Sequence, residues 1–189
     1  MNLKKITIIA ATLLIFVFAG CKKDSNDPAI LGQFTYLNKT YNLTHGVNVG
    51  YSSTVDSIYG IDLILMSSGL QIVNSGDTAS LVTGRGDVIG VTLYSTSVNI
   101  LEPGEYTCSD TIVAGQFGNG FLIVNYEPST QTADNQATVK SGTVSIAKEE
   151  DIFDITMNMV SDEGKTITGN YKGSLTYYSG AATKAVLVK

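Results

Sequence analysis

The sequence predicts an all-β fold, and three observations lead to that prediction. Apolar and polar residues alternate with a period of two over much of the chain, which is the pattern of strands with one buried face. Clusters of glycine, asparagine, aspartate and serine separate these segments, as expected of turns. Beyond the first 20 residues, no stretch shows the apolar spacing of a convincing helix.

The most strongly predicted element is a C-terminal hairpin. Residues 153–159 alternate apolar and polar side chains. A second alternating run forms the other strand of the predicted hairpin. Its predicted inward face consists of Ile167, Gly169, Tyr171, Gly173, Leu175 and Tyr177. The link 161–164 has acids early and glycine late, which suits a tight turn with a positive φ.

Similar alternation predicts strands along the rest of the chain. We expect two strands within 34–43 that turn at Asn38-Lys39, single strands over 58–66, 88–96, 121–126 and 139–147, and weaker ones over 46–51, 69–74 and 105–108. All three prolines lie between these segments, where a missing amide hydrogen removes no ladder bond. The expected result is one domain of nine or ten antiparallel strands.

So many strands form either a closed barrel or a sandwich of two sheets. Gly169 and Gly173 both lie on the predicted inward face of the last hairpin, where absent side chains let a strand bend and coil. This feature favours an antiparallel β-barrel, with an antiparallel β-sandwich as the alternative.

The first 20 residues have the composition of an export signal. Lys4 and Lys5 precede an apolar stretch over 6–18 that is too short to span a bilayer as a helix. The segment Phe18-Ala19-Gly20-Cys21 then resembles the bacterial lipobox, in which cleavage occurs before a lipid-bearing cysteine. This resemblance implies a signal peptide over 1–20, lipidated Cys21 with a polar tether over 21–32, and a single all-β domain over 33–189.

Two further resemblances concern the envelope and the fold. Lys22 replaces the aspartate that holds many lipoproteins at the inner membrane, and 22–27 resembles the acid-rich surface signal of Bacteroidota-type lipoproteins, although a solvated tether has the same composition. The segments 142–146, 153–159 and 164–173 are similar to the C-terminal part of such lipoproteins with calycin-like, that is lipocalin-like, β domains. The resemblance implies a lipid-anchored outer-membrane protein that faces the cell surface or the periplasm. It carries no active site, because a fold alone does not define a function.

Composition narrows the classes of function. The net charge of -5 becomes more negative once Lys4 and Lys5 leave with the signal, which argues against a nucleic-acid partner. With Cys21 lipidated, Cys108 has no cysteine to pair with and is expected to pack as a small apolar residue. The single histidine, His45, cannot build a multi-histidine metal site and is expected in a loop.

Motifs that suggest catalysis or ligand binding are incomplete. Gly164-Lys165-Thr166 matches the end of a phosphate-binding loop, but Met159 occupies the place of its first glycine. The tripeptide over 85–87 resembles the integrin-binding Arg-Gly-Asp motif and also has the composition of a tight turn. Neither pattern assigns a function.

The acidic residues do not complete a catalytic set. The cluster of Glu149, Glu150 and Asp151 is typical of a solvated turn. Asp62 lies among apolar residues and, if buried, needs a partner, for which Arg85 is the candidate. We therefore expect neither an enzyme nor a cofactor, with a hydrolase based on Asp62 or the Glu149 cluster as the less favoured alternative.

Three segments share an Asp-Ser/Thr-apolar pattern. They resemble acceptors of the Bacteroidota-type periplasmic O-glycosylation system, which implies glycans on Ser57, Thr78 and Thr111. Ordinary turns, in which aspartate caps the following backbone, produce the same pattern.

The remaining functions are binding and structure. Ten tyrosines, among them Tyr51, Tyr59, Tyr94 and Tyr178, favour a module that binds a glycan, a peptide or a small apolar ligand, because tyrosine offers an apolar face with a polar tip. The alternative is an accessory subunit that docks on another envelope protein. An open interior favours a small ligand, whereas a filled interior favours the loops and docking.

Overall fold

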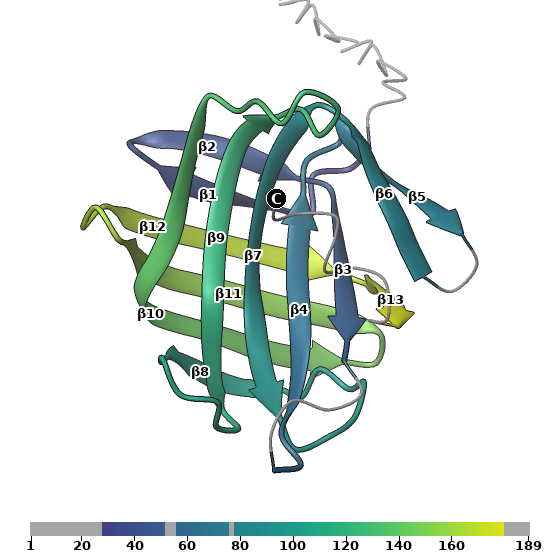
Figure 1. The fold of residues 1–189 in the computed structure, drawn as a ribbon, viewed down its shortest axis with the longest axis vertical. Coiled ribbons are helices and arrows are strands. Elements are labelled where there is room, and N and C mark those ends of the chain that lie inside the picture. The colour runs from purple at the N-terminus through teal and green to yellow at the C-terminus, as the bar shows by residue number, and fades with distance from the viewer. Residues whose placement is uncertain (1–27, 52–55, 76–77, 180–189) are drawn as a thin grey trace, which may run out of the picture.

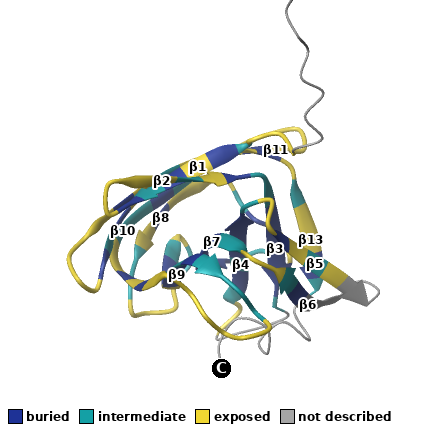
Figure 2. Ribbon diagram, turned by 90° about the horizontal axis from the view of Figure 1, so that it is seen from above, coloured by how far each residue is buried: buried dark blue, intermediate teal, exposed yellow. Residues whose placement is uncertain are grey.

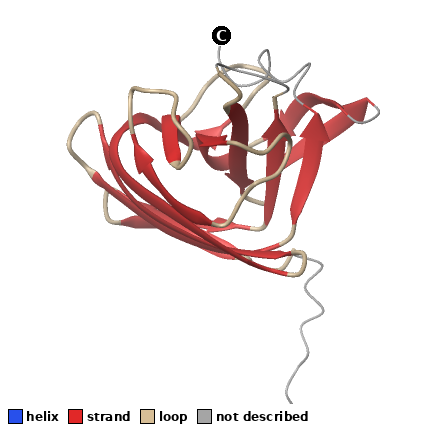
Figure 3. Cartoon of the chain, turned by 90° about the horizontal axis from the view of Figure 1, so that it is seen from below, coloured by secondary structure: helices blue, strands red, loops and turns tan. Residues whose placement is uncertain are grey.

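The computed structural model describes residues 28–51, 56–75 and 78–179, which form strands and turns without a helix (Figure 3). Within these ranges, no helical segment has the length and apolar character needed to cross a membrane. The described strands are β1 (Gly32–Tyr36), β2 (Lys39–Leu43), β3 (His45–Gly50), β4 (Tyr59–Met66), β5 (Leu70–Ser75), β6 (Thr78–Gly84), β7 (Gly86–Ser95), β8 (Gly104–Cys108), β9 (Gln116–Tyr126), β10 (Asn135–Glu149), β11 (Ile152–Ser161), β12 (Thr166–Gly173) and β13 (Leu175–Ser179).

Eleven of the described strands form one strongly curled sheet in the order β13-β3-β4-β7-β9-β8-β10-β11-β12-β1-β2, with β9 also paired to β10. The curl sets β3, β4, β7 and β9, the front layer, across β10, β11, β12, β1 and β2, the back layer (Figure 1). Strands β5 and β6 form a separate hairpin beside the front layer. The all-β prediction is therefore confirmed, and the sheet has the shape of a half-barrel.

The predicted C-terminal hairpin is confirmed. Val160 pairs with Thr166 across the turn, and Gly164 has a φ of 74°. A residue with a side chain would be strained in this conformation. Ile167 and Tyr171 are buried as expected, because the alternation places them on the face that meets the front layer.

Two pairings differ from the antiparallel expectation. β13 runs parallel to β3, and β8 runs parallel to β9. The first arises because the chain continues from β12 through Ser174 into β13, and so passes from the back layer to the edge of the front layer. The change of partner also reverses the burial pattern: Tyr177 is 42% exposed, whereas Tyr178 is 7% exposed. The inward prediction for Tyr177 was therefore wrong.

Two other details were not predicted. The first hairpin turns at Leu37 and Asn38, one residue earlier than expected, and both residues have positive φ values, as this tight turn requires. Strand β6 has no strong alternation of apolar and polar residues, and it is positioned by its antiparallel pairing with β5. With the division of the last run at Ser174, the described residues form thirteen strands rather than nine or ten.

Apolar side chains fill the space between the two layers. Phe34, Phe117 and Tyr171 are among the largest fully buried residues, and they belong to one continuous cluster. Buried segments occur in strands of both layers (Figure 2). A second cluster, which includes Val47, Ile64 and residues of the β5–β6 hairpin, lies on the outer face of the front layer. Burial on both faces explains why β4 lacks a clean alternation.

Candidate functional site

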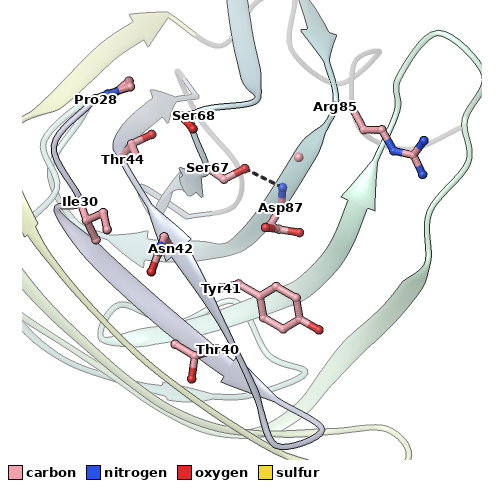
Figure 4. A pocket seen from close by; sticks show the side chains of 11 residues that line it. Pro28, Ile30, Thr40, Tyr41, Asn42, Thr44, Ser67, Ser68, Arg85 and Asp87 are labelled. Carbon is pink, nitrogen blue, oxygen red and sulfur yellow. Dashed lines mark hydrogen bonds between the residues drawn. The ribbon is translucent and has the colours of Figure 1, made fainter. Parts of the chain in front are cut away.

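The candidate site is a pocket of about 570 Å³ at one end of the half-barrel (Figure 4). Its lining comes from the segment before β1, from β2, from the residues after β4 and from the start of β7. The lining residues are Pro28, Ile30, Thr40, Tyr41, Asn42, Thr44, Ser67, Ser68, Arg85, Gly86 and Asp87. The lining is therefore rich in hydroxyl groups, with one amide side chain, one aromatic ring, one carboxylate and one guanidinium group.

Asp87 is half-buried in this pocket and is fixed by two backbone hydrogen bonds. Its own amide donates to Ser67 Oγ at 2.8 Å, and its Oδ1 accepts from the amide of Asn125 at 2.9 Å. The second bond forms at an irregularity of the β7–β9 ladder, where the register shifts between Gly86 and Val88 and Asn125 has a φ of 54°. No described residue donates to Oδ2, so this oxygen is available to a ligand.

The environment of Asp87 favours its neutral form. Burial raises the pKa of the Asp87 carboxyl, the Asn125 amide opposes this effect, and the charge of Asp134 raises the pKa further. The ionised carboxylate is therefore incompletely compensated by the protein. A ligand that donates hydrogen bonds to it would supply the missing stabilisation.

Tyr41 supplies the aromatic surface of the pocket. It lies opposite Phe34 in the β1–β2 hairpin, and the two rings stack with centroids 4.9 Å apart and planes at 23°. Because fully buried Phe34 covers one face of the ring, the opposite face is the one available to the pocket. Burial, followed by the charges of Asp87 and Asp134, raises the pKa of Tyr41, so its hydroxyl remains a hydrogen-bond donor.

Arg85 points away from Asp87 (Figure 4). Its Nε donates to Asn125 Oδ1 at 2.8 Å, and its guanidinium lies 3.9 Å from Glu127 and 3.8 Å from Asp134. These contacts hold the half-exposed arginine against the β9–β10 connection. The Arg-Gly-Asp sequence thus enters a strand, and both of its charged side chains are hydrogen-bonded to Asn125, unlike those of a recognition motif presented on a free loop.

Asp62 has partners other than the expected one. It accepts hydrogen bonds from Tyr51 at 2.5 Å and from Thr92 at 2.7 Å. Burial and the bond to Asp62 raise the pKa of Tyr51, which keeps this donor protonated. The suggested pairing of Asp62 with Arg85 was therefore wrong, and two hydroxyl groups satisfy the carboxylate instead.

The Glu149 cluster is exposed, as its composition predicted: Glu149 ends β10, and Glu150 and Asp151 form the turn before β11. Glu150 has a φ of 53° at this turn. Among the described residues, no group of three or more histidine, cysteine or acidic side chains is arranged to hold a metal ion.

His45 and Cys108 both lie at strand ends. His45 begins β3, so its loop assignment was wrong, and its Nδ1 lies 3.1 Å from Thr44 Oγ1. Cys108 ends β8 and packs half-buried against the main core, in agreement with the packing role expected. Burial, the largest effect, raises the pKa of the Cys108 thiol, which disfavours the reactive thiolate.

His45 is expected to make the fold less stable in mild acid. Burial lowers its pKa below the ordinary value of 6.5, so the folded state binds a proton less readily than the unfolded state. The contribution of neutral His45 to the stability of the fold is complete above pH 6.5, and it is lost as the pH falls through the folded-state pKa. In thermal unfolding between pH 7.5 and 5, His45→Asn should flatten the decline of Tm seen in the wild type. Identical slopes in the two proteins would contradict this prediction.

The predicted modification sites are placed as follows. Cys21 lies outside the described residues. Ser57 and Thr111 are exposed, and Thr78 is the first residue of β6. The Thr111 hydroxyl lies 2.8 Å from Ser109 Oγ and donates to Gln116 at 3.0 Å, so a glycan there would have to replace this local bond.

No protein-family model matches this chain, and neither the curated proteins nor the solved structures contain a significant match. Function is therefore inferred from the geometry of the pocket. Sequence reasoning did not single out Tyr41 or Ser67, and it considered Asp87 only as part of the Arg-Gly-Asp tripeptide. These residues belong to segments that only the curl of the sheet brings together. The register irregularity at Asn125, which fixes Asp87, has no distinctive sequence pattern.

Proposed function

We propose that the protein is a lipid-anchored, non-enzymatic binding module of the outer membrane, and that it binds a glycan in the Tyr41 pocket. The single observation behind this proposal is the combination of an aromatic face with a half-buried carboxylate in one open, polar pocket. Sugar rings have apolar C–H faces, which stack on tyrosine rings. They also have hydroxyl groups, which donate hydrogen bonds to carboxylates. Asp87 Oδ2 and Tyr41 are suited to these two parts of a sugar.

A calycin-like barrel is the proposed architecture. The run from β12 into β13 pairs with β11 and β1 in the back layer and then with β3 at the edge of the front layer. One chain segment thereby takes part in both layers of the curled sheet, which supports a barrel over the sandwich alternative. The filled interior favours a ligand at the rim over an apolar molecule inside.

An accessory subunit is the second candidate. Two loops expose large apolar side chains: Val98 and Ile100 after β7, and Ile112 and Val113 after β8. Such loops suit contact with another envelope protein. Mild crosslinking in intact cells followed by purification of the tagged protein tests this candidate, and recovery of the protein alone would count against it.

The glycan proposal predicts a large effect of Asp87→Asn. The full-length chain in lipid nanodiscs is screened against a glycan array, and affinities for the hits are measured by calorimetry. Loss of a charge-assisted hydrogen bond of about 1.5–3 kcal/mol lowers affinity roughly 10- to 100-fold. The matched control is Asp154→Asn, since Asp154 pairs with Lys172 on the exposed face of the back layer. Absence of saturable glycan binding, or equal binding by Asp87→Asn, would refute the proposal.

The same variant is expected to be more stable than the wild type at neutral pH. The raised pKa means that the folded state holds the Asp87 proton more tightly, so stability falls as the pH rises from the ordinary value of 3.8 through the folded-state pKa. The side-chain oxygen of an asparagine can still accept a hydrogen bond from the Asn125 amide, and it carries no charge. The Tm advantage of Asp87→Asn should shrink as the pH falls through this window, and a growing advantage would contradict the assignment.

A further inference from the structure

A second pocket, of about 450 Å³, lies between β3, β13, the β10–β11 turn and the loop after β7. It shares no lining residue with the Tyr41 pocket. Its walls include the apolar side chains of Leu101, Phe153 and Leu175, together with the exposed ring of Tyr177. Asn48, on β3, also lines the pocket, and this residue is only 7% exposed.

The sequence of β3 isolates Asn48 on one face of the strand. Val47 and Val49 point to the outer cluster, which leaves Gly46, Asn48 and Gly50 on the face toward the main core. Leu175 and Leu65 occupy the space beside Gly46, since their methyl carbons lie 2.5 and 2.7 Å from where a Cβ would be. Asn48 is therefore the only residue of β3 that extends a side chain beyond Cα on this face.

The Asn48 amide has no side-chain hydrogen bond to any described residue. Burying an amide without a partner costs about 1–3 kcal/mol, and leucine at this position would avoid that cost. Native proteins satisfy nearly all such groups, so an orphaned amide calls for a specific explanation. Its place in the wall of a pocket supplies one, because a ligand bound there would be the missing partner.

The chemistry of the pocket defines the ligand. A primary amide offers a donor and an acceptor side by side, which matches the adjacent N–H and C=O of a cyclic amide. The apolar and aromatic walls suit a flat ring. The two charged lining residues have opposite signs, Lys148 and Asp151, and the Lys148 ammonium already lies 5.1 Å from the centre of the Phe153 ring.

We propose that this pocket is a second binding site, for a small neutral molecule in which an apolar ring carries a cyclic-amide edge that pairs with Asn48. The site is independent of the Tyr41 pocket. The probe is 2-quinolinone, which has both the flat ring and the edge. N-methyl-2-quinolinone is its matched control, because the methyl group removes the donor and blocks the edge.

The test uses NMR of the isotope-labelled full-length chain in nanodiscs. We expect 2-quinolinone to shift the side-chain amide resonances of Asn48 saturably, and the N-methyl compound to bind at least tenfold more weakly. Asn48→Leu should abolish this discrimination, whereas Asn158→Ala, a change at an exposed position of β11, should leave it intact. Tyr177→Ala should weaken both probes and keep their ratio, because Tyr177 contributes only the wall.

Stability supplies an independent measurement. Asn48→Leu removes the unpartnered amide and is expected to raise Tm while binding is lost. The inference is overturned if both probes bind equally to the wild type, if Asn48→Leu retains the discrimination, or if no Asn48 resonance shifts. A Tm that falls in Asn48→Leu would also overturn it, because the amide would then not be a net cost to the ligand-free fold.

Discussion

Phe34→Ala is expected to destabilise the fold by about 3–5 kcal/mol, the usual loss when a fully buried phenylalanine is reduced to alanine. Phe34 is 0% exposed and belongs to the cluster between the two layers. It also supports the ring of Tyr41 across the β1–β2 hairpin. Denaturant unfolding of the full-length chain measures the first effect, and affinity for a glycan identified by the array measures the second.

Phe34→Leu separates the two roles of this residue. Leucine fills part of the cavity, so the loss of stability should be smaller than for alanine. It offers no flat face to Tyr41, so the affinity for the glycan should still fall. Alanine and leucine variants with wild-type stability would contradict the assigned packing, and a leucine variant with full affinity would contradict the role of Phe34 in positioning Tyr41.

Cys21→Ala is expected to abolish lipid labelling and to release the protein from the membrane. The reason is the proposed lipid anchor: each buried methylene contributes about 0.8 kcal/mol, and more than one acyl chain holds a protein durably. Metabolic labelling with an alkyne fatty acid, followed by fractionation, measures both effects. The thermal unfolding of the β domain should not change.

Cys108→Ala is the matched control for this prediction. It removes the other cysteine of the sequence, which packs against the core at the end of β8. Because Cys108 should take no label, Cys108→Ala should keep the labelling and the membrane retention of the wild type. Continued labelling and membrane retention of Cys21→Ala would exclude Cys21 as the anchor and would remove the basis for the proposed localisation.

The alternation of apolar and polar residues predicted the strands that have one solvent-exposed face. It failed where the neighbouring elements change along a strand. β11 alternates throughout, so its burial could be predicted residue by residue. The run that contains β12 was also recognised. No sequence pattern indicates the change of strand partner at Ser174, so the predicted alternation of buried and exposed residues is wrong at Tyr177. The position of β6 depends on its partner β5, which local pattern alone does not reveal.

Site chemistry was less predictable because it depends on register. Asp62 was recognised as needing a partner, but charge alone suggested Arg85. Thr92 lies directly opposite Asp62 in the β4–β7 pair, so a known register would have identified this hydroxyl as a partner. Asn48 was passed over because a lone asparagine between two valines is ordinary in a strand, and only the burial of its amide shows that it is unusual.

The parallel contact between β13 and β3 also determines when the protein can finish folding. Leu175 pairs with Gly46, so the edge of the front layer remains open until nearly the whole chain is present. Contacts between such distant residues slow folding, because the chain entropy is lost before the contact is gained. Under the proposed export, with the N-terminus first, this delay would keep the polypeptide extended while it passes through a translocation channel. During the same interval β3 is an unprotected edge that can pair with other chains.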